Sequence, residues 1–248
     1  MLDIKAIILA GGPGSRFHPY TEIIPKSMVP VGRHEKPVLE IIIKWIKRHG
    51  IGKFIFLVDY KWKYIYNYFG NGSRFNVTIE YSHDDQRGYR NTGGAILKAH
   101  RAGMFKDRAL IWYGDIIAPI NINALLKYHE DRKADLTLVV TSKYKVPVGV
   151  AQVSDDFRVV QMVEKPELDI SATIGVGVVE ENVFEKDIES ILGKDFDFMG
   201  NFVPWLISSG YRVYAYIYDG LWFDVGSLER YKKINYGDLS VFDDVVLD

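Results

Sequence analysis

The 248 residues contain 31 Lys and Arg against 32 Asp and Glu, and the resulting net charge of -1 provides no basic surface for nucleic acid or an anionic membrane. The chain has no cysteine, which excludes disulfides, thiolate catalysis and cysteine-ligated zinc, and no apolar run approaches the roughly 20 residues needed to span a bilayer. Since the length suffices for a substantial core, we expect one domain, residues 1–248, with a small-molecule partner.

The first predicted element is a strand at residues 5–10, whose nearly continuous apolar sequence is typical of a strand buried on both faces of a parallel sheet. No signal peptide precedes this strand, so we expect a cytoplasmic protein. A glycine-rich loop with a following arginine occupies residues 11–16, and its backbone N–H groups can approach phosphates closely. The loop fits neither a Walker A motif nor a dinucleotide fingerprint. It therefore predicts a nucleotide site of another kind.

Helical and strand patterns then alternate along the chain. Apolar residues recur at helical spacing between positions 39 and 46, and Gly50 can end this helix in a left-handed conformation. Strands are expected at residues 54–58, 77–81, 109–113 and 136–140, and helices at residues 62–69, 94–102 and 123–132. This alternation predicts an α/β fold, a single Rossmann-like domain with a mostly parallel mixed sheet flanked by helices.

After residue 140 the predicted strands become shorter. Residues 148–154, 159–163 and 173–179 are expected to build a small β subregion, with a hairpin turn at residues 155–156. A helix at 202–208 ended by Gly210, a strand at 212–217, a turn at 219–220 and a strand at 221–225 are expected to complete the fold.

The segment from residue 5 to residue 30 contains the pattern G-G-x-G-S-R-x-x-P-x-T-x-x-x-P-K-x-x-x-P. It resembles the signature of the sugar-phosphate nucleotidyltransferases, also called NDP-sugar pyrophosphorylases, with serine where the family usually has threonine. The resemblance implies that the strand end and the loop bind the nucleotide through Leu9, Ala10, Gly11, Gly12, Gly14 and Ser15. It also implies that Arg16 and Lys26 are catalytic and stabilise the triphosphate and the departing pyrophosphate.

A second segment, QRGYRNTGGA at residues 86–95, resembles the family's base-recognition motif. An amide side chain offers both the donor and the acceptor that a base edge requires, although a glutamine here could also be an ordinary loop residue. The resemblance implies that Gln86, Asn91, Thr92 and Gly94 bind the nucleotide. Since Asn91 stands where relatives have glycine, we hypothesise that it alters base preference.

Two aspartates follow predicted strands, Asp115 after residues 109–113 and Asp224 within W-F-D-V-G. Open α/β sheets bind ligands beyond the carboxyl ends of their strands, and a carboxylate pair suits Mg²⁺. Either aspartate could instead be a turn residue. Both match the family motifs G-D and W-x-D-x-G, which implies that the pair holds Mg²⁺.

The sugar side of the expected site rests on a third group of matches. Glu164-Lys165-Pro166 resembles the family's E-K-P motif, which implies a catalytic Lys165 that binds the sugar phosphate. Gly149 lies in a segment similar to the sugar-binding Y-G-V stretch, and Thr173 occupies the place of the asparagine in N-A-G. The implied sugar-phosphate site therefore consists of Gly149, Glu164, Lys165 and Thr173, with the small β subregion on this side.

The resembled reaction joins a nucleoside triphosphate and a hexose or heptose 1-phosphate into an NDP-sugar by Mg²⁺-dependent in-line attack on the α-phosphate. Nucleic acid and membranes are not expected partners. The many Tyr and Trp residues would suit the interface of a homo-oligomer. Too few residues follow position 225 to form the C-terminal β-helix that many relatives have. Two alternatives stay open. One is a non-catalytic subunit that senses NDP-sugar, and the other is a metal-dependent glycosyltransferase, whose Asp-x-Asp motif could only be Asp195-Phe196-Asp197.

Overall fold

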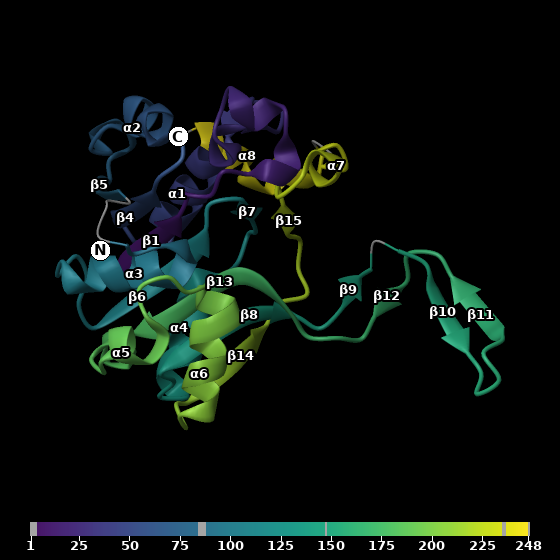
Figure 1. Ribbon diagram of the computed structural model, residues 1–248. Helices are drawn as coiled ribbons and strands as arrows, with labels where there is room; N and C mark the ends of the chain where they lie inside the picture. The colour runs from purple at the N-terminus through teal and green to yellow at the C-terminus, as the bar shows by residue number, and fades with distance from the viewer. Residues whose placement is uncertain (1–3, 84–87, 147, 235–236, 248) are drawn as a thin grey trace.

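The computed structural model describes residues 4–83, 88–146, 148–234 and 237–247. Its centre is a seven-stranded sheet in the order β14-β8-β13-β6-β1-β4-β5 (Figure 1). The strands are β1 (Lys5–Leu9), β4 (Lys53–Val58), β5 (Thr78–His83), β6 (Arg108–Tyr113), β8 (Leu136–Thr141), β13 (Ala172–Glu180) and β14 (Val213–Ile217). Only β13 runs antiparallel to its neighbours. The predicted α/β fold with a mostly parallel mixed sheet is confirmed.

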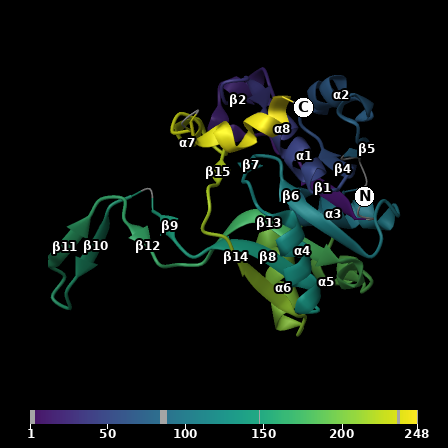
Figure 2. The ribbon, with the colours of Figure 1, turned by 180° about the vertical axis from the view of Figure 1, so that it is seen from behind.

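Helices cover both faces of this sheet because successive strand residues point to opposite sides. In β1, Ile8 packs into one buried apolar cluster and Ile7 into the other. The first cluster includes residues of α1 (Val38–Arg48), α2 (Trp62–Phe69), α4 (Ile122–Asp131) and α8 (Asp243–Leu247), and the second includes residues of α3 (Asn91–Arg101), α5 (Ile188–Leu192) and α6 (Val203–Ser208) (Figure 2). None of the helices in the described residues is both long and apolar enough to cross a membrane.

The structure differs from the sequence prediction at residues 173–179. They form most of β13 in the central sheet rather than part of a separate β subregion. The reason is burial: Ile174, Val176 and Val178 pack in the core, which a small solvent-exposed subregion could not provide. Gly175, at φ 80, lies where the pairing with β8 shifts register, and a Cβ there would meet the Tyr113 ring at 3.1 Å.

The chain end also differs from expectation, because the fold does not finish at residue 225. The predicted strand at 221–225 is reduced to β15 (Phe223–Asp224), which pairs with β7 (Ile116–Ile117). The short α7 (Leu228–Tyr231) follows, and α8 then packs on α1. In the 3-10 turn just before α8, the Phe242 ring lies 5.1 Å from the Trp45 ring of α1.

Two short ribbons leave the body of the protein. β9 (Tyr144–Lys145) pairs with β12 (Glu167–Leu168), and beyond them β10 (Val150–Val153) pairs with β11 (Val159–Val163). Both views show this segment projecting away from the sheet (Figures 1 and 2). The strands predicted at 148–154 and 159–163 and their turn are confirmed. We call residues 144–146 and 148–168 the arm. One further pair of short strands, β2 (Pro30–Val31) and β3 (Lys36–Pro37), precedes α1.

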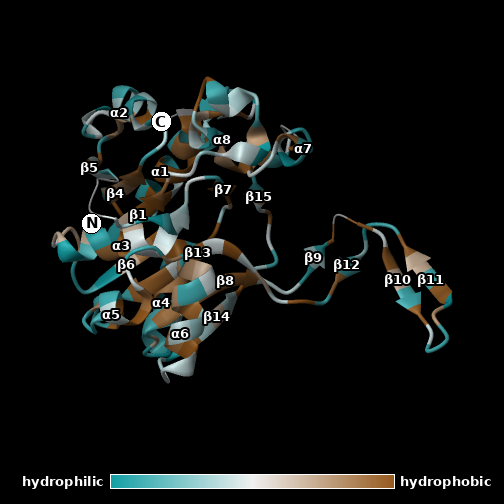
Figure 3. Ribbon diagram, viewed as in Figure 1, coloured by the Kyte–Doolittle hydropathy of each residue, from teal (hydrophilic) through white to brown (hydrophobic). Residues whose placement is uncertain are grey.

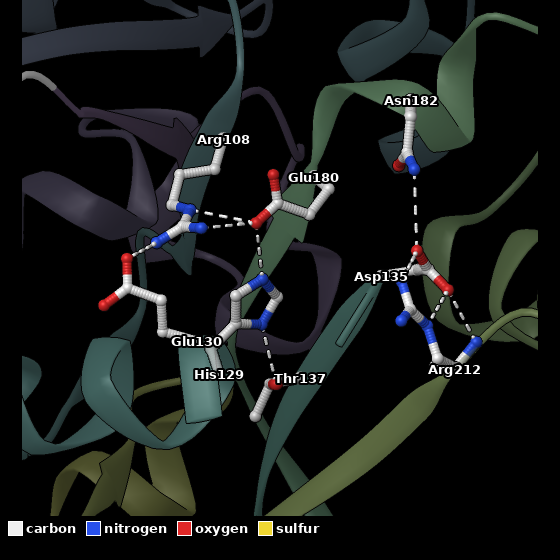
Figure 4. A network of polar contacts seen from close by, with 8 residues as sticks. All are labelled: Arg108, His129, Glu130, Asp135, Thr137, Glu180, Asn182 and Arg212. Carbon is white, nitrogen blue, oxygen red and sulfur yellow. Dashed lines mark hydrogen bonds and ion pairs between the residues drawn. The ribbon is translucent and has the colours of Figure 1, made fainter. Parts of the chain in front are cut away.

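Polar side chains form two clusters near the amino ends of β6, β8 and β14 (Figure 4). In one, the buried His129 lies 2.7 Å from Thr137 Oγ1 and 3.0 Å from Glu180 Oε1, and Arg108 Nε donates to the same Glu180 oxygen at 2.9 Å. In the other, Asp135 accepts hydrogen bonds from the backbone N–H and the guanidinium of Arg212. These contacts join β6, β8, β13 and β14 at one end of the sheet.

Asp135 and Glu180 should make the free energy of unfolding depend on pH. Hydrogen bonds from Arg212 lower the pKa of Asp135 below 3.8 despite burial. Burial alone would raise the pKa of Glu180, but the hydrogen bond from His129 and the charge of Arg108 lower it below 4.5. The unfolded chain therefore takes up these protons at higher pH than the folded chain. Their stabilisation is present at neutral pH and is lost as pH falls below about 4.

Urea unfolding at about pH 7, about pH 4 and about pH 2.5 tests this expectation, because the free energy of unfolding should fall mainly between the two lower values. Asp135→Asn should be less stable than the wild type at neutral pH and should show a shallower pH dependence. A variant with the unaltered pH slope would contradict the role given to Asp135.

Candidate active site

A cavity of about 700 Å³ opens beyond the carboxyl ends of β1, β4, β5 and β6. Along the chain, β1 is followed by β4 and β5 on one side, and β6 then takes the other side of β1. The cavity therefore lies where the strand order reverses, which is where open α/β sheets bind ligands. Its volume is typical of small-molecule sites.

The cavity brings together most of the predicted nucleotide site. Its lining includes Leu9, Ala10, Gly11, Gly12, Arg16, Lys26, Asn91, Thr92 and Asp115. Gly14, Ser15 and Gly94 are not among the lining residues, and Gln86 lies outside the described residues.

The glycines of the first loop have different local environments. Gly12 is exposed, and a Cβ at this position would meet no atom within 4 Å, so its backbone is open to a ligand. Gly14 has φ 65, and a Cβ there would lie 2.9 Å from Thr21 Cγ2. Thr21 also donates its hydroxyl to the Gly14 carbonyl at 3.1 Å. Gly14 thus provides the left-handed turn that leads into the 3-10 turn Ser15–Phe17.

Both predicted catalytic cations of the nucleotide side lie at the cavity. Arg16 is exposed, and no described carboxylate forms an ion pair with it. Lys26 contacts Asp115 through its Nζ, and the two side chains are only 19% and 16% exposed. In this arrangement Lys26 and Asp115 neutralise each other. Arg16, Arg90 and Lys98 then outnumber Asp59 among the other charged lining residues, which favours an anionic ligand.

The start of α3 is held by the loop that contains Asp195 and Asp197. Asn91, at φ 57, donates to Asp195 at 2.5 Å, and Thr92 donates to Asp197 at 2.7 Å. Close packing explains the adjacent glycine pair: a Cβ at Gly94 would lie 2.2 Å from the Lys194 carbonyl oxygen, and a Cβ at Gly93 would lie 2.3 Å from the Phe196 ring. These glycines let the two segments approach each other.

Several cavity residues were not predicted from the sequence, among them Asp59, Ser82, Tyr89, Arg90 and Tyr113. Tyr113 ends β6, and its burial raises its pKa well above the ordinary value, so its hydroxyl stays protonated at neutral pH. Some of these residues could have been predicted from their position in the sequence, because each strand that ends at this edge of the sheet contributes residues to the cavity lining. Residue type alone does not distinguish them from core or loop residues.

The two predicted metal ligands come from adjacent backbone segments. The pairing of β7 with β15 sets Asp224 opposite Ile116, and the Val225 N–H donates to the Asp115 carbonyl at 2.9 Å. Carboxylates are the hard oxygen donors that Mg²⁺ prefers, and this ion usually keeps water and substrate phosphate as its other ligands. The donor set therefore fits Mg²⁺. Within the described ranges no group of three or more His, Asp or Glu side chains could hold a metal ion.

A second cavity, of about 510 Å³, lies between the arm and α7 and is lined by Lys165, Asp224, Trp222, Arg230 and Lys233 among others. Arg230 contacts the Asp224 carboxylate, a partner that the sequence did not predict. The hydrogen bond from Lys233, with the charges of Lys233 and Lys165, lowers the pKa of Glu229 on α7. Lys165 therefore lies near Glu229 on α7, and it lines the same cavity as Asp224.

The other predicted sugar-side residues lie at the edges of this region. Gly149, Glu164 and Thr173 line neither of the two cavities. Glu164 lies 3.6 Å from Lys165, and a Cβ at Gly149 would be 3.0 Å from the Glu164 carboxylate, so these residues are neighbours at the root of β10 and β11. Thr173 is an exposed residue of β13 paired with Val140.

Residues 5–240 match the protein-family model described as nucleotidyl transferase. The chain belongs to this family. Members similar to it include a UTP--glucose-1-phosphate uridylyltransferase from Synechocystis sp., 28% identical over 96% of this chain and 64% of the relative. A D-glycero-alpha-D-manno-heptose 1-phosphate guanylyltransferase from Aneurinibacillus thermoaerophilus is 31% identical over 93% of this chain and 96% of its own length.

The fold of this nucleotidyl transferase family member is also that of solved structures. HddC from Yersinia pseudotuberculosis, crystallised in complex with GMP-PN, superposes with a TM-score of 0.70 over 93% of this chain and 97% of that chain, at 23% identity. The chain spans less than two thirds of the length of the Synechocystis relative, whereas it spans nearly all of the heptose 1-phosphate guanylyltransferase.

Proposed function

We propose that residues 1–248 form one catalytic domain that transfers a nucleotidyl group from a nucleoside triphosphate to a sugar 1-phosphate and releases pyrophosphate. The observation that supports this most strongly is the backbone pairing that links one aspartate of each cavity. Asp115 lines the cavity with the glycine loop and Arg16, Asp224 lines the cavity with Lys165, and the two aspartates lie on paired strand segments. Relatives named for transfer to glucose 1-phosphate and heptose 1-phosphate agree with this proposal.

The proposed chemistry requires charge neutralisation more than acid–base catalysis. The second pKa of a phosphate monoester is about 6, so the sugar phosphate is largely dianionic at neutral pH and needs no general base. The barrier lies in bringing two anions together for an in-line attack on the α-phosphorus. Arg16 and Lys26 would bind the triphosphate, and Lys165 would bind the attacking sugar phosphate.

Mg²⁺ held by Asp115 and Asp224 would supply further neutralisation of phosphate charge. Without substrate, the same carboxylates are compensated by protein cations, Asp115 by Lys26 and Asp224 by Arg230. Both cations lie at cavity walls, so each can turn from its carboxylate to a phosphate oxygen when substrates enter. The carboxylates would then be neutralised by Mg²⁺ and the cations by phosphate, so no charged group would be left without a partner when substrates bind.

A grid of pyrophosphate-release assays tests the proposal, with UTP, dTTP, CTP, GTP and ATP each combined with glucose, mannose, N-acetylglucosamine and heptose 1-phosphates in the presence of Mg²⁺. We expect release that requires both one triphosphate and one sugar phosphate. A blank grid from folded protein that still binds an NDP-sugar would instead support a non-catalytic sensing subunit.

The glycosyltransferase alternative is disfavoured by the contacts of the Asp-x-Asp triplet. Asp195 and Asp197 accept hydrogen bonds from Asn91 and Thr92, and Asp197 also accepts from the Gly200 N–H at 2.6 Å. These carboxylates hold the start of α3, and neither lines the cavity that contains the glycine loop and Arg16.

Asn91→Gly tests the proposed link between this residue and base preference. Glycine accepts the positive φ of position 91, so the backbone should persist while the hydrogen bond to Asp195 is lost. We expect the relative turnover of the five triphosphates to shift by about tenfold, the effect of roughly one hydrogen bond. Asn76→Gly is the matched control, because Asn76 is exposed, has φ 53 and does not line the cavity. An unchanged profile in Asn91→Gly would remove the hypothesis.

A further inference from the structure

Arg230 of α7 contacts the carboxylate of Asp224, one of the two aspartates that would hold Mg²⁺. The contact is partly buried, since the Arg230 side chain is 38% exposed and the Asp224 side chain 19% exposed. Gly226 makes room for this carboxylate, because a Cβ at position 226 would lie 2.3 Å from Asp224 Oδ1. The absence of a side chain there lets Asp224 lie against Arg230.

This ion pair bears on how the two aspartates could share a metal ion. Asp224 lines the second cavity but not the first, whereas Asp115, in contact with Lys26, lines the first but not the second. A shared Mg²⁺ needs an oxygen of each carboxylate within about 2.1 Å. Arg230 opposes this arrangement, either by occupying an oxygen of Asp224 or by repelling the ion. Arg230 therefore lowers the affinity of Asp224 for a metal ion.

The backbone that carries Arg230 is fixed by its neighbours. Ser227 Oγ accepts a hydrogen bond from the Arg230 N–H at 3.3 Å. The Tyr231 hydroxyl donates to the Pro30 carbonyl at 2.8 Å, and the Tyr231 ring lies 5.7 Å from the Phe17 ring. Arg230 can therefore change its ion-pair partner by rotation of its own side chain, without movement of α7.

The second cavity suits another anion as that partner. Among the described residues, five basic and three acidic side chains line it, so its net charge is positive. Figure 3 shows hydrophilic residues on both segments that border it, α7 and the start of the arm. A phosphate monoester carries about -1.5 to -2 charges at pH 7, and a guanidinium can bind it through two parallel hydrogen bonds. Such a phosphate attracts Arg230 more strongly than a carboxylate does.

We propose that Arg230 is a second binding residue for the sugar phosphate, besides Lys165, and that it couples sugar-phosphate binding to metal binding. This inference rests on the proposed function. A phosphate in the second cavity draws Arg230 from Asp224, whose carboxylate then binds the metal ion more tightly. Conversely, Arg230 is free for the phosphate once Asp224 binds the ion. Because such coupling is reciprocal, each ligand should tighten binding of the other, typically by about 5- to 150-fold.

The primary test is a titration with Mn²⁺ alone, followed through the electron paramagnetic resonance signal of the free ion. Mn²⁺ takes the same carboxylate ligands as Mg²⁺. Arg230→Gln should bind Mn²⁺ about tenfold more tightly than the wild type, because the amide has no charge to compete for Asp224. A role of Arg230 in stability alone would not produce this gain. Replacing Asp224 by Asn in the Arg230→Gln protein should abolish it.

Lys233→Gln is the matched control. Lys233 lines the same cavity, but it contacts the exposed Glu229 rather than Asp224. The substitution therefore removes one positive charge from the cavity and leaves the pair of Arg230 and Asp224 in place. Exposed charges contribute little, so the Mn²⁺ affinity should stay within about twofold of the wild type. An equal gain in both variants would reduce the effect to general electrostatics and contradict the proposal.

The coupling is tested by repeating the titrations with inorganic phosphate, which carries the group common to all sugar 1-phosphates. Phosphate should tighten Mn²⁺ binding to the wild type, and much less to Arg230→Gln. An increase of equal size in both proteins would indicate direct contact of ion and phosphate and would overturn the proposal. If Arg230→Gln does not fold, Arg230→Lys serves instead. It retains the charge, so Mn²⁺ alone should bind as in the wild type, but the effect of phosphate should be smaller.

The titrations do not depend on turnover. An active enzyme whose Mn²⁺ affinity is unaffected by Arg230→Gln would contradict this inference alone. Tighter Mn²⁺ binding by Arg230→Gln, in a protein that releases no pyrophosphate with any substrate pair, would contradict the proposed function alone.

Discussion

Arg16→Ala is expected to lower the rate of pyrophosphate release by about 10²- to 10³-fold, the usual cost of removing one electrostatic stabiliser of a transition state. Arg16 lines the cavity at the carboxyl ends of β1, β4, β5 and β6 and is exposed, and it has no ion-pair partner among the described carboxylates. Its removal should therefore leave the fold intact. Arg16→Lys should also be impaired, because a point charge cannot reproduce the planar, two-pronged contact of a guanidinium with phosphate.

The control for Arg16 is Arg48→Ala, which removes an exposed arginine from the last turn of α1, away from both cavities. Its rate should equal that of the wild type. Steady-state kinetics with the best substrate pair of the grid, together with a thermal unfolding curve for each variant, separate catalysis from stability. Near-full turnover of Arg16→Ala would contradict the role assigned to this residue.

Asp115→Asn is expected to have the second large effect, a loss of at least about 10²-fold in rate together with a higher half-saturating Mg²⁺ concentration. The amide preserves the shape of the side chain but removes the charge that compensates Lys26 and would bind the metal. Asp224→Asn should act in the same direction, because its backbone is paired with the segment that follows Asp115. Chelation of divalent ions should abolish wild-type turnover.

The matched control is Asp131→Asn, a removal of one carboxylate from an exposed ion pair with Lys127 on α4. Rate and Mg²⁺ dependence should be unchanged. Metal titrations of turnover at saturating substrates give both quantities in one experiment. If Asp115→Asn kept the wild-type rate and the wild-type Mg²⁺ dependence, the proposed metal site would be wrong.

Much of the fold could be predicted because its signals are local. Residues 39–46 have helical apolar spacing and Gly50 follows, and the structure has α1 at Val38–Arg48 with Gly50 at φ 89. The apolar run at 109–113 is likewise confirmed as β6. Residues 173–179 were misplaced because their sequence identifies a strand but not the sheet it joins. β13 pairs with β6, which is far away in the sequence, and a local sequence pattern does not specify such a long-range pairing.

The site was predictable to the extent that each motif lies at a strand end. Gly12 and Arg16 are far from Asp115 in sequence, yet all three line one cavity, as expected for the carboxyl edge of a parallel sheet. The partners of these residues could not be predicted. Nothing in the sequence pairs Lys26 with Asp115 or Arg230 with Asp224, because such contacts depend on how the 3-10 turn at Lys26–Met28 and α7 pack. Asn91 was predicted to bind the nucleotide and to alter base preference, and its bond to Asp195 was not predicted.

The two polar clusters of Figure 4 lie near the amino ends of β6, β8 and β14, whereas both cavities lie toward the opposite end. Substitutions in the loops that would contact a base or a sugar therefore leave the interactions of Arg108, His129 and Asp135 untouched. Such a layout lets substrate preference diverge during evolution without a large loss of stability. Relatives 28% and 31% identical to this chain carry the names of different bases and different sugars.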